Sequence, residues 1–210
     1  MKKRRNPTLL IVTLFAYLVI YFPIMFIMVM SFNESERYYR FTTIGFKWYQ
    51  EIFINESLLD AIGNTLFIAI LSTIVATIVG TFTAIGINSL RKSKRANMMI
   101  LNNIPVINPD IVTGISLMIV FSLLPISFGM PTMLLAHIFF SIPFVVLNVL
   151  PKLKELDKNM FDAALDLGCT RLQAIFKVII PSVKSGIIAG ALIAFTMSID
   201  DFVISYFVSG

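Results

Sequence analysis

Charged side chains are scarce in this chain. Asp, Glu, Lys and Arg together make up 14% of its 210 residues, whereas 57% are hydrophobic. A soluble globular domain carries about 25% charged residues, so this composition excludes a soluble domain of ordinary make-up. The mean hydropathy of +0.86 indicates an integral membrane protein instead.

Cysteine and histidine are almost absent, with one residue of each, Cys169 and His137. A single cysteine excludes an internal disulfide. No second imidazole, thiol or carboxylate stands at ligand spacing from His137. We therefore interpret His137 as a helix-packing residue with satisfied nitrogens, in preference to a metal ligand or a proton relay.

The motifs of nucleotide and covalent chemistry are missing as well. The sequence has no Gly-rich phosphate loop ending in Lys-Ser/Thr, no nucleophile elbow and no paired catalytic constellation. We therefore expect that the chain is not an enzyme, that it holds no cofactor and no metal ion, and that it does not itself hydrolyse ATP.

Long apolar runs, in contrast, are abundant. Each of five runs is long enough to cross a hydrocarbon core, which requires about 20 helical residues. The first run is much longer than the apolar core of about 7–15 residues in a signal peptide, so we retain it as a span. We predict one domain over residues 1–210, an all-α transmembrane helix bundle with spans at Thr8–Met30, Thr65–Ile87, Ala96–Leu124, Met130–Leu150 and Val183–Val208.

Lys and Arg fall mainly on one side of this predicted bundle. Because positively charged loops stay in the cytoplasm, we place the N-terminus and the long loop between the fourth and fifth spans on the cytoplasmic side. This topology explains the net charge of +5 without nucleic-acid binding. The basic residues on that side are Lys2, Lys3, Arg4, Arg5, Arg91, Lys92, Lys94, Arg95, Lys152, Lys154, Lys158, Arg171, Lys177 and Lys184.

A polar helix–turn–helix pattern occupies residues 162–181 of the long loop. The first helix contains Asp162-Ala163-Ala164-Leu165 and should end at Gly168, because glycine adopts the left-handed conformation with little strain. Thr170 precedes Gln173 by three residues, a capping-box pattern. A second helix should therefore begin directly after Thr170 and run toward the proline at position 181. The two small alanines leave a shallow surface for a partner.

This spacing resembles the EAA loop of ATP-binding-cassette (ABC) importer permeases, with Asp162 where Glu is usual. The resemblance implies that residues 151–182 form the cytoplasmic element that docks on an ATPase subunit. The alternative is an ordinary solvated hairpin that only connects two spans. The coupling residues that the resemblance implies are Asp162, Ala163, Ala164, Gly168 and Pro181.

Ionisable residues inside a span are energetically costly and therefore informative. Asp110 lies in the third span, where Pro105 and Pro109 interrupt the helix and three asparagines can satisfy the freed backbone groups or line a wet cavity. At about 1.5 Å per residue from Ala96, Asp110 is expected roughly 20 Å into a core of about 30 Å. The alternative is a carboxylate that is hydrogen-bonded within the bundle and holds a kink.

Two further carboxylates, Asp200 and Asp201, lie toward the outer end of the fifth span. Ser198, Asp201 and Ser205 share one helical face, because they occupy positions i, i+3 and i+7. Two anions at the outer mouth, with Asp110 deeper, would attract a cation and offer a multivalent cation several contacts. This pattern points to a polycation as the substrate. The alternative is an acidic pair that is simply solvated at a helix end.

The stretch Phe195–Ser205, the segment Gly45–Tyr49 and the loop together resemble the second permease subunit of spermidine/putrescine ABC importers. The resemblance implies a bacterial inner-membrane subunit that works by alternating access and pairs with a homologous second permease. It also implies a dimer of ATPase subunits, which bind ATP and Mg²⁺, and an extracytoplasmic polyamine-binding protein. The lipid bilayer is the remaining expected partner, and nucleic acid is not. The expected substrate path contains Trp48, Asp110, Ser198, Asp200, Asp201 and Ser205.

Several alternatives stay open at this point. Trp48 lies either at the headgroup level or against an ammonium group at the mouth of the path. Permeases of this family usually have a sixth span, so we expect the chain to stop one helix short. Importers for iron, sulfate or thiamine share the loop. A secondary carrier in which Asp110 binds a coupling proton is less favoured, because the chain has a docking loop and no evident inverted repeat.

Overall fold

The computed structural model describes residues 7–35, 37, 40–157 and 159–210. The basic residues assigned to the cytoplasm at Lys2, Lys3, Arg4, Arg5 and Lys158 lie outside the described residues. The chain packs as two compact units, Met1–Ile62 and Gly63–Gly210. That the whole chain acts as one permease domain stays a prediction.

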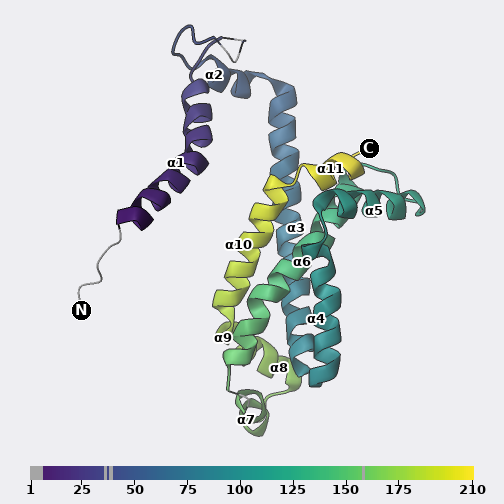
Figure 1. The fold of residues 1–210 in the computed structure, drawn as a ribbon. Helices are drawn as coiled ribbons and strands as arrows, with labels where there is room; N and C mark the ends of the chain where they lie inside the picture. The colour runs from purple at the N-terminus through teal and green to yellow at the C-terminus, as the bar shows by residue number, and fades with distance from the viewer. Residues whose placement is uncertain (1–6, 36, 38–39, 158) are drawn as a thin grey trace. The chain divides into compact units, whose positions relative to one another are not determined.

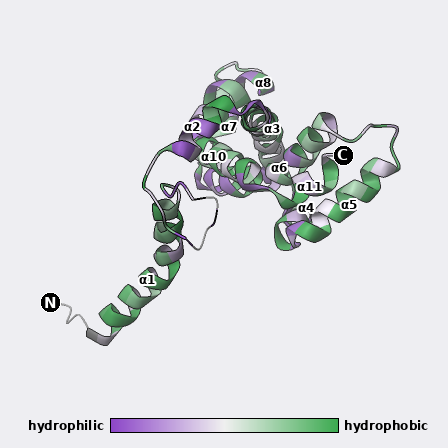
Figure 2. Ribbon diagram, turned by 90° about the horizontal axis from the view of Figure 1, so that it is seen from above, coloured by the Kyte–Doolittle hydropathy of each residue, from purple (hydrophilic) through white to green (hydrophobic). Residues whose placement is uncertain are grey.

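The first unit contains helix α1 (Pro7–Met30), helix α2 (Lys47–Ile54) and the beginning of helix α3 (Glu56–Ser89). The side chains of α1 from Thr8 to Val29 are all exposed, and Figure 2 shows α1 as hydrophobic along most of its length. A helix that is apolar all round lies in lipid or against another subunit. This composition agrees with the predicted first span.

The second unit is a bundle in which α10 packs along α6 (Figure 1). Short helices lie at both ends of the bundle: α7 to α9 at one end, and α5 with α11 at the other. Its helices after α3 are α4 (Lys92–Ile107), α5 (Asp110–Ser122), α6 (Met130–Glu155), α7 (Met160–Asp166), α8 (Arg171–Ala174), the π-helix η1 (Ile175–Ile179), α9 (Ile180–Ser182), α10 (Lys184–Asp200) and α11 (Val203–Val208).

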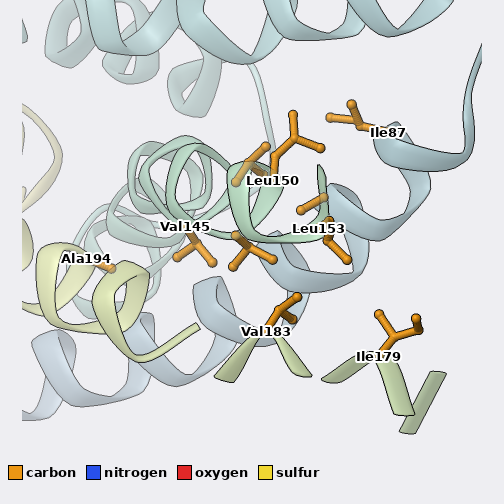
Figure 3. Packing of buried hydrophobic residues seen from close by; sticks show 10 residues of the cluster. Ile87, Val145, Leu150, Leu153, Ile179, Val183 and Ala194 are labelled. Carbon is orange, nitrogen blue, oxygen red and sulfur yellow. The ribbon is translucent and has the colours of Figure 1, made fainter. Parts of the chain in front are cut away.

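The core of the second unit gathers around α6. Ile87 of α3, Leu150 of α6 and Val183 beside α10 belong to one buried cluster (Figure 3). Glycines allow the neighbouring helices to approach α6 closely. A Cβ added to Gly80 of α3 would lie 2.7 Å from Val145 Cβ, and one added to Gly190 of α10 would lie 3.0 Å from Val145 Cα. Two helices therefore contact α6 at the same residue.

Three of the described helices are long and apolar enough to cross a membrane by themselves: α1 over Thr8–Met30, α3, and α6. These helices confirm the first, second and fourth predicted spans. Two bent pairs, α4 with α5 and Arg171–Ser182 with α10, raise the number to five if each pair is one span. The structure is thus the predicted all-α membrane bundle.

The third predicted span is sharply bent. Helices α4 and α5 meet at 103°, and Asn108 between them has extended backbone angles, φ −72° and ψ 140°. Pro109 explains the break, because proline has no N–H to donate and disfavours a helical conformation in the residue before it. The straight helix from Ala96 that the expected depth of Asp110 assumed continues only to Ile107, and the depth itself stays a prediction.

The fifth predicted span, Val183–Val208, is not one continuous helix either. Helix α10 ends at Asp200, and Asp201 is extended, with φ −75° and ψ 109°. The Asp201 carboxylate accepts the backbone N–H groups of Ile204 at 3.1 Å and Ser205 at 3.0 Å. Asp201 lies one residue before Phe202, the N-cap residue of a new helix, α11, and from there its side chain satisfies N–H groups of the first turn, which have no partner within the helix. The prediction of an uninterrupted span is wrong because it took Asp201 only as a charged group.

Candidate functional site

The hairpin between α6 and α10 turns at Gly168, as the sequence predicts. Gly168 has a φ of +86°. Its N–H donates to the Leu165 carbonyl at 2.9 Å, and the N–H of Cys169 donates to the Ala164 carbonyl at 3.1 Å. These two bonds form a Schellman motif, which satisfies the last carbonyls of α7. The predicted end of the first helix is confirmed.

The predicted capping box is also present. Gln173 N–H donates to Thr170 Oγ at 3.3 Å, and Thr170 N–H donates to Gln173 Oε1 at 2.9 Å. Helix α8 begins at Arg171 and continues through η1 into α9. Within η1 the bonding pattern widens, because Ile180 N–H donates to the Ile175 carbonyl. Pro181 follows directly and cannot donate a backbone bond, which favours such an irregular turn.

The coupling residues differ in exposure. Asp162, Ala163 and Gly168 are exposed, whereas Ala164 is buried. The expectation of a shallow surface made of two alanines is therefore wrong for Ala164, which packs inside the hairpin. Leu167, which no motif in the sequence singled out, is 87% exposed beside the turn. A single exposed leucine does not by itself define a docking surface.

A cavity of about 700 Å³ lies behind the hairpin. The end of α3, the beginning of α4 and the end of α6 form three of its sides, and Phe161 and Ile175 of the hairpin form another. Arg95 closes part of the rim and donates to the carbonyl of Asn88. The hairpin therefore packs against the ends of three long helices and can transmit a displacement to them.

At the other end of the bundle, His137 of α6 joins a buried polar network. Its ring Nδ1 lies 2.7 Å from Ser198 Oγ of α10, and its Nε2 lies 3.0 Å from Ser205 Oγ of α11. Ser205 Oγ donates to Asp201 Oδ2 at 3.1 Å. Ser72 of α3 completes the network, with its Oγ 3.1 Å from Ser198 Oγ. The interpretation of His137 as a buried residue with satisfied nitrogens is confirmed.

This network borders a pocket of about 290 Å³. The structure brings four predicted path residues together at the pocket, namely Ser198, Asp200, Asp201 and Ser205, and adds His137 to its lining. Asp200 is exposed, whereas the side chain of Asp201 is only 5% exposed. The described lining holds two carboxylates and neither lysine nor arginine. Its electrostatic character therefore suits a cation.

Asp110 and Trp48 do not line that pocket. Asp110 is the first residue of α5 and is exposed, where its charge interacts favourably with the helix N-terminus. Trp48 belongs to the first unit, where its indole N–H donates to the Asn33 carbonyl at 2.8 Å and the Lys47 ammonium lies 4.9 Å from its ring centroid. The indole face therefore already accommodates an ammonium group of this chain.

Comparison with known proteins identifies the family. A family model described as "Binding-protein-dependent transport system inner membrane component" matches residues 76–210. The chain belongs to this family. As a binding-protein-dependent transport component, it is a multi-pass protein of the inner membrane and a transport permease. Family membership supports the predicted ABC importer permease over the ion-coupled secondary carrier.

Relatives of the transport component cover most of its length. It is 38% identical over 197 residues to the spermidine/putrescine transport system permease protein PotC of Escherichia coli (strain K12), an alignment that covers 92% of this chain and 74% of PotC. It is 33% identical over 213 residues to the putrescine transport system permease protein PotI of the same strain, covering 98% of this chain and 76% of PotI.

A solved structure shares the fold of the transport component. A chain of a bacterial ABC transporter involved in the import of the acidic polysaccharide alginate superposes with a TM-score of 0.75 at 18% identity, covering 97% of this chain and 76% of that chain. This likeness concerns the fold alone. It agrees with the predicted helical permease architecture.

Proposed function

We propose that this chain is a permease subunit of an ATP-driven importer that brings polyamines such as spermidine and putrescine into the cytoplasm. The observation that carries the proposal is the pocket with two carboxylates beside the α10–α11 break, in a chain whose relatives are named as polyamine permeases. The proposed path residues are Trp48, Asp110, Ser198, Asp200, Asp201 and Ser205.

The chemistry of the pocket fits an ammonium group. A primary ammonium presents three N–H donors, and the pocket offers carboxylate and hydroxyl oxygens as acceptors. Charge-assisted hydrogen bonds of this kind are stronger than neutral ones. A linear polyamine repeats its positive charge along a flexible chain, so a second ammonium group can contact another carboxylate of the path, for which we propose Asp110.

The hairpin supports a coupling role. It is continuous with α6 on one side and with α10 on the other, and both helices reach the network around His137. In our proposal an ATPase dimer contacts the exposed turn at Asp162, Ala163 and Gly168 from the cytoplasm, and its closure rocks α6 and α10 to open the path outward. Pro181 ends the moving element. The N-terminus shares the cytoplasmic side.

The remaining subunits follow from this role. A homologous second permease completes the path and covers apolar surface, and an extracytoplasmic binding protein delivers polyamine. This chain itself holds no cofactor in our proposal, because ATP and Mg²⁺ bind to the ATPase subunits. Related importers carry other solutes, and the acidic pocket is what favours a polyamine.

Carboxylate-to-amide variants test the substrate. We expect Asp110→Asn, Asp200→Asn and Asp201→Asn each to lower spermidine uptake roughly tenfold to hundredfold, because a hydrogen bond to a charged group contributes about 1.5–3 kcal/mol. Uptake is measured in vesicles that contain the whole importer and its binding protein, at matched abundance. Asp60→Asn, at an exposed position of α3 outside this pocket, is the control. Parental uptake in all three path variants would remove the physical basis of the polyamine assignment.

The energy source provides a separate test. We expect uptake to require ATP inside the compartment where the ATPase lies, and the purified chain alone to hydrolyse no ATP. Polyamine uptake driven by a proton gradient, with no ATPase subunit in the vesicle, would establish a secondary carrier instead.

A further inference from the structure

His137 spans the break between α10 and α11. Its Nδ1 meets Ser198, which lies in the last turn of α10, and its Nε2 meets Ser205, which lies in the first turn of α11. The His137 side chain is only 3% exposed, so little water competes for these bonds. A single imidazole therefore ties together two helices whose backbones are interrupted between their two contact residues.

The direction of the hydrogen bonds follows from their last member. Ser205 Oγ–H donates to the Asp201 carboxylate. Because a hydroxyl group has only one hydrogen, Ser205 Oγ can then only accept a hydrogen bond from the ring. If the ring is neutral, Nε2 of His137 then carries the hydrogen and Nδ1 accepts from Ser198 Oγ–H, because a neutral imidazole has one donor and one acceptor. The bonds run in one direction, from Ser198 through the ring and Ser205 to Asp201.

Asp201 is held firmly as a result. Its Oδ1 accepts from the backbone of Ile204, and its Oδ2 accepts from both the backbone and the hydroxyl of Ser205, with His137 Nε2 3.5 Å away. Asp200, one residue earlier, is exposed at the same pocket. The two neighbouring carboxylates therefore differ in what surrounds them.

We propose that His137 is a positioning residue, which acts through Ser205 to keep Asp201 turned into the bundle and so sets how the acidic pair presents itself to the cation. This inference rests on the proposed function. Although His137 lines the pocket, its role in this proposal is to act on Asp201 and not on the substrate. It fixes the geometry of the α10–α11 break, and Asp200 is the more accessible carboxylate of the pocket.

Two amide variants separate the two ring nitrogens. Gln places its side-chain N–H₂ near the position of Nε2, and Asn places its amide near Nδ1. We expect His137→Gln to retain most of the spermidine-stimulated ATP hydrolysis of the assembled importer and His137→Asn to lose up to about tenfold, because one hydrogen bond between neutral groups contributes about 0.5–1.5 kcal/mol. Equal losses in the two variants would overturn the proposal, because a residue that only fills space shows no preference for one nitrogen.

A double-mutant cycle tests whether His137 acts through Asp201. Interaction between residues appears as non-additive effects. In the Asp201→Asn background we expect His137→Asn to lower ATP hydrolysis by less than about twofold further. In the matched Asp200→Asn background we expect the same substitution to keep its full effect of about tenfold. Additive losses in both backgrounds would show that His137 does not act through Asp201.

Two further measurements keep the proposal testable. Where His137→Asn does not assemble, Ser205→Ala removes the hydroxyl between the ring and the carboxylate and should show the same dependence on Asp201. If spermidine does not stimulate the parental importer, the proposed substrate is wrong. The cycle is then read from thermal unfolding of the assembled complex, in which additive effects of His137→Asn and Asp201→Asn would contradict the contact itself.

Discussion

Replacement of Gly168 tests whether the backbone of the hairpin turn couples this subunit to its ATPase. The φ of +86° at Gly168 lies in the left-handed region, where a residue with a Cβ is strained by roughly 1–2 kcal/mol. A Cβ added there meets no atom within 4 Å, so Gly168→Ala adds strain without a clash. The strain acts against the two hydrogen bonds that close the Schellman motif.

The size of the strain sets the expected effect. A loss of 1–2 kcal/mol lowers the equilibrium ratio of the native turn to its alternative conformations by a factor of roughly 5–30. Asparagine adopts the left-handed region more readily than alanine, and a β-branched side chain adds a restricted χ1. ATP-driven uptake should therefore decrease in the order parent, Gly168→Asn, Gly168→Ala and Gly168→Val, with Gly168→Val near zero although the protein still inserts.

The assay is uptake by the whole importer in vesicles, divided by the amount of ATPase that copurifies with the permease. The order of the variants decides between two causes, because asparagine is larger than alanine. If the partner surface merely requires a small side chain, Gly168→Ala would transport better than Gly168→Asn. Normal uptake and normal ATPase assembly in Gly168→Val would refute the coupling role of the turn.

Two further predictions concern packing and the indole. A Cβ at Gly186 would lie 2.8 Å from the carbonyl oxygen of Asn148 on α6, whereas one at Gly63 meets nothing within 4 Å. Gly186→Ala should therefore lower the free energy of unfolding by about 1–3 kcal/mol, and Gly63→Ala should not. Thermal unfolding of the complex in detergent checks this difference. At Trp48, Phe keeps an aromatic face and Leu does not. If the Trp48 ring contacts an ammonium group of the substrate, that cation–π contact contributes about 0.5–1 kcal/mol at an exposed site, and uptake should fall severalfold in Trp48→Leu but not in Trp48→Phe. Equal losses in the two variants would assign the role of Trp48 to its indole N–H bond.

The hairpin is largely predictable from the sequence, because its signals are local. A glycine that ends one helix and a Thr170–Gln173 capping box that begins the next act within a few residues, and both are present in the structure. What the pattern does not reveal is which alanine faces outward. Ala164 is buried in α7, which contacts α8 and η1, and that packing depends on the angle between the helices, which no short motif specifies.

The breaks in the third and fifth spans are harder to predict. Pro109 signals an interruption but not its angle of 103°. The second break contains neither proline nor glycine, and only the side chain of Asp201, which accepts N–H groups of the first turn of α11, marks it. A hydropathy pattern averages over such a residue and returns one span.

The network around His137 is the part that sequence reasoning missed. His137 and Ser198 are 61 positions apart, so only the packing of α6 against α10 brings them together. A signal was nevertheless present. A lone imidazole in an apolar span requires polar partners, and the fifth span offered a face with Ser198, Asp201 and Ser205.

Helices α3 and α10 both contact α6 at Val145, through Gly80 and Gly190. This shared contact is a point about which α6 can pivot like a lever. Val145 lies 15 residues from Met130 and 10 residues from Glu155, which corresponds to arms of about 22 Å and 15 Å at the helical rise per residue. If α6 tilts as a rigid rod about this fulcrum, its far end travels roughly one and a half times as far as the end that adjoins the hairpin, and in the opposite direction. The acidic pocket lies on the longer arm. Its lining residues on α6, Met133 and His137, lie 12 and 8 residues from Val145, or about 18 Å and 12 Å. A small push at the hairpin would thus reach the pocket at about its original size and reversed in direction, without any change in the internal structure of the rod.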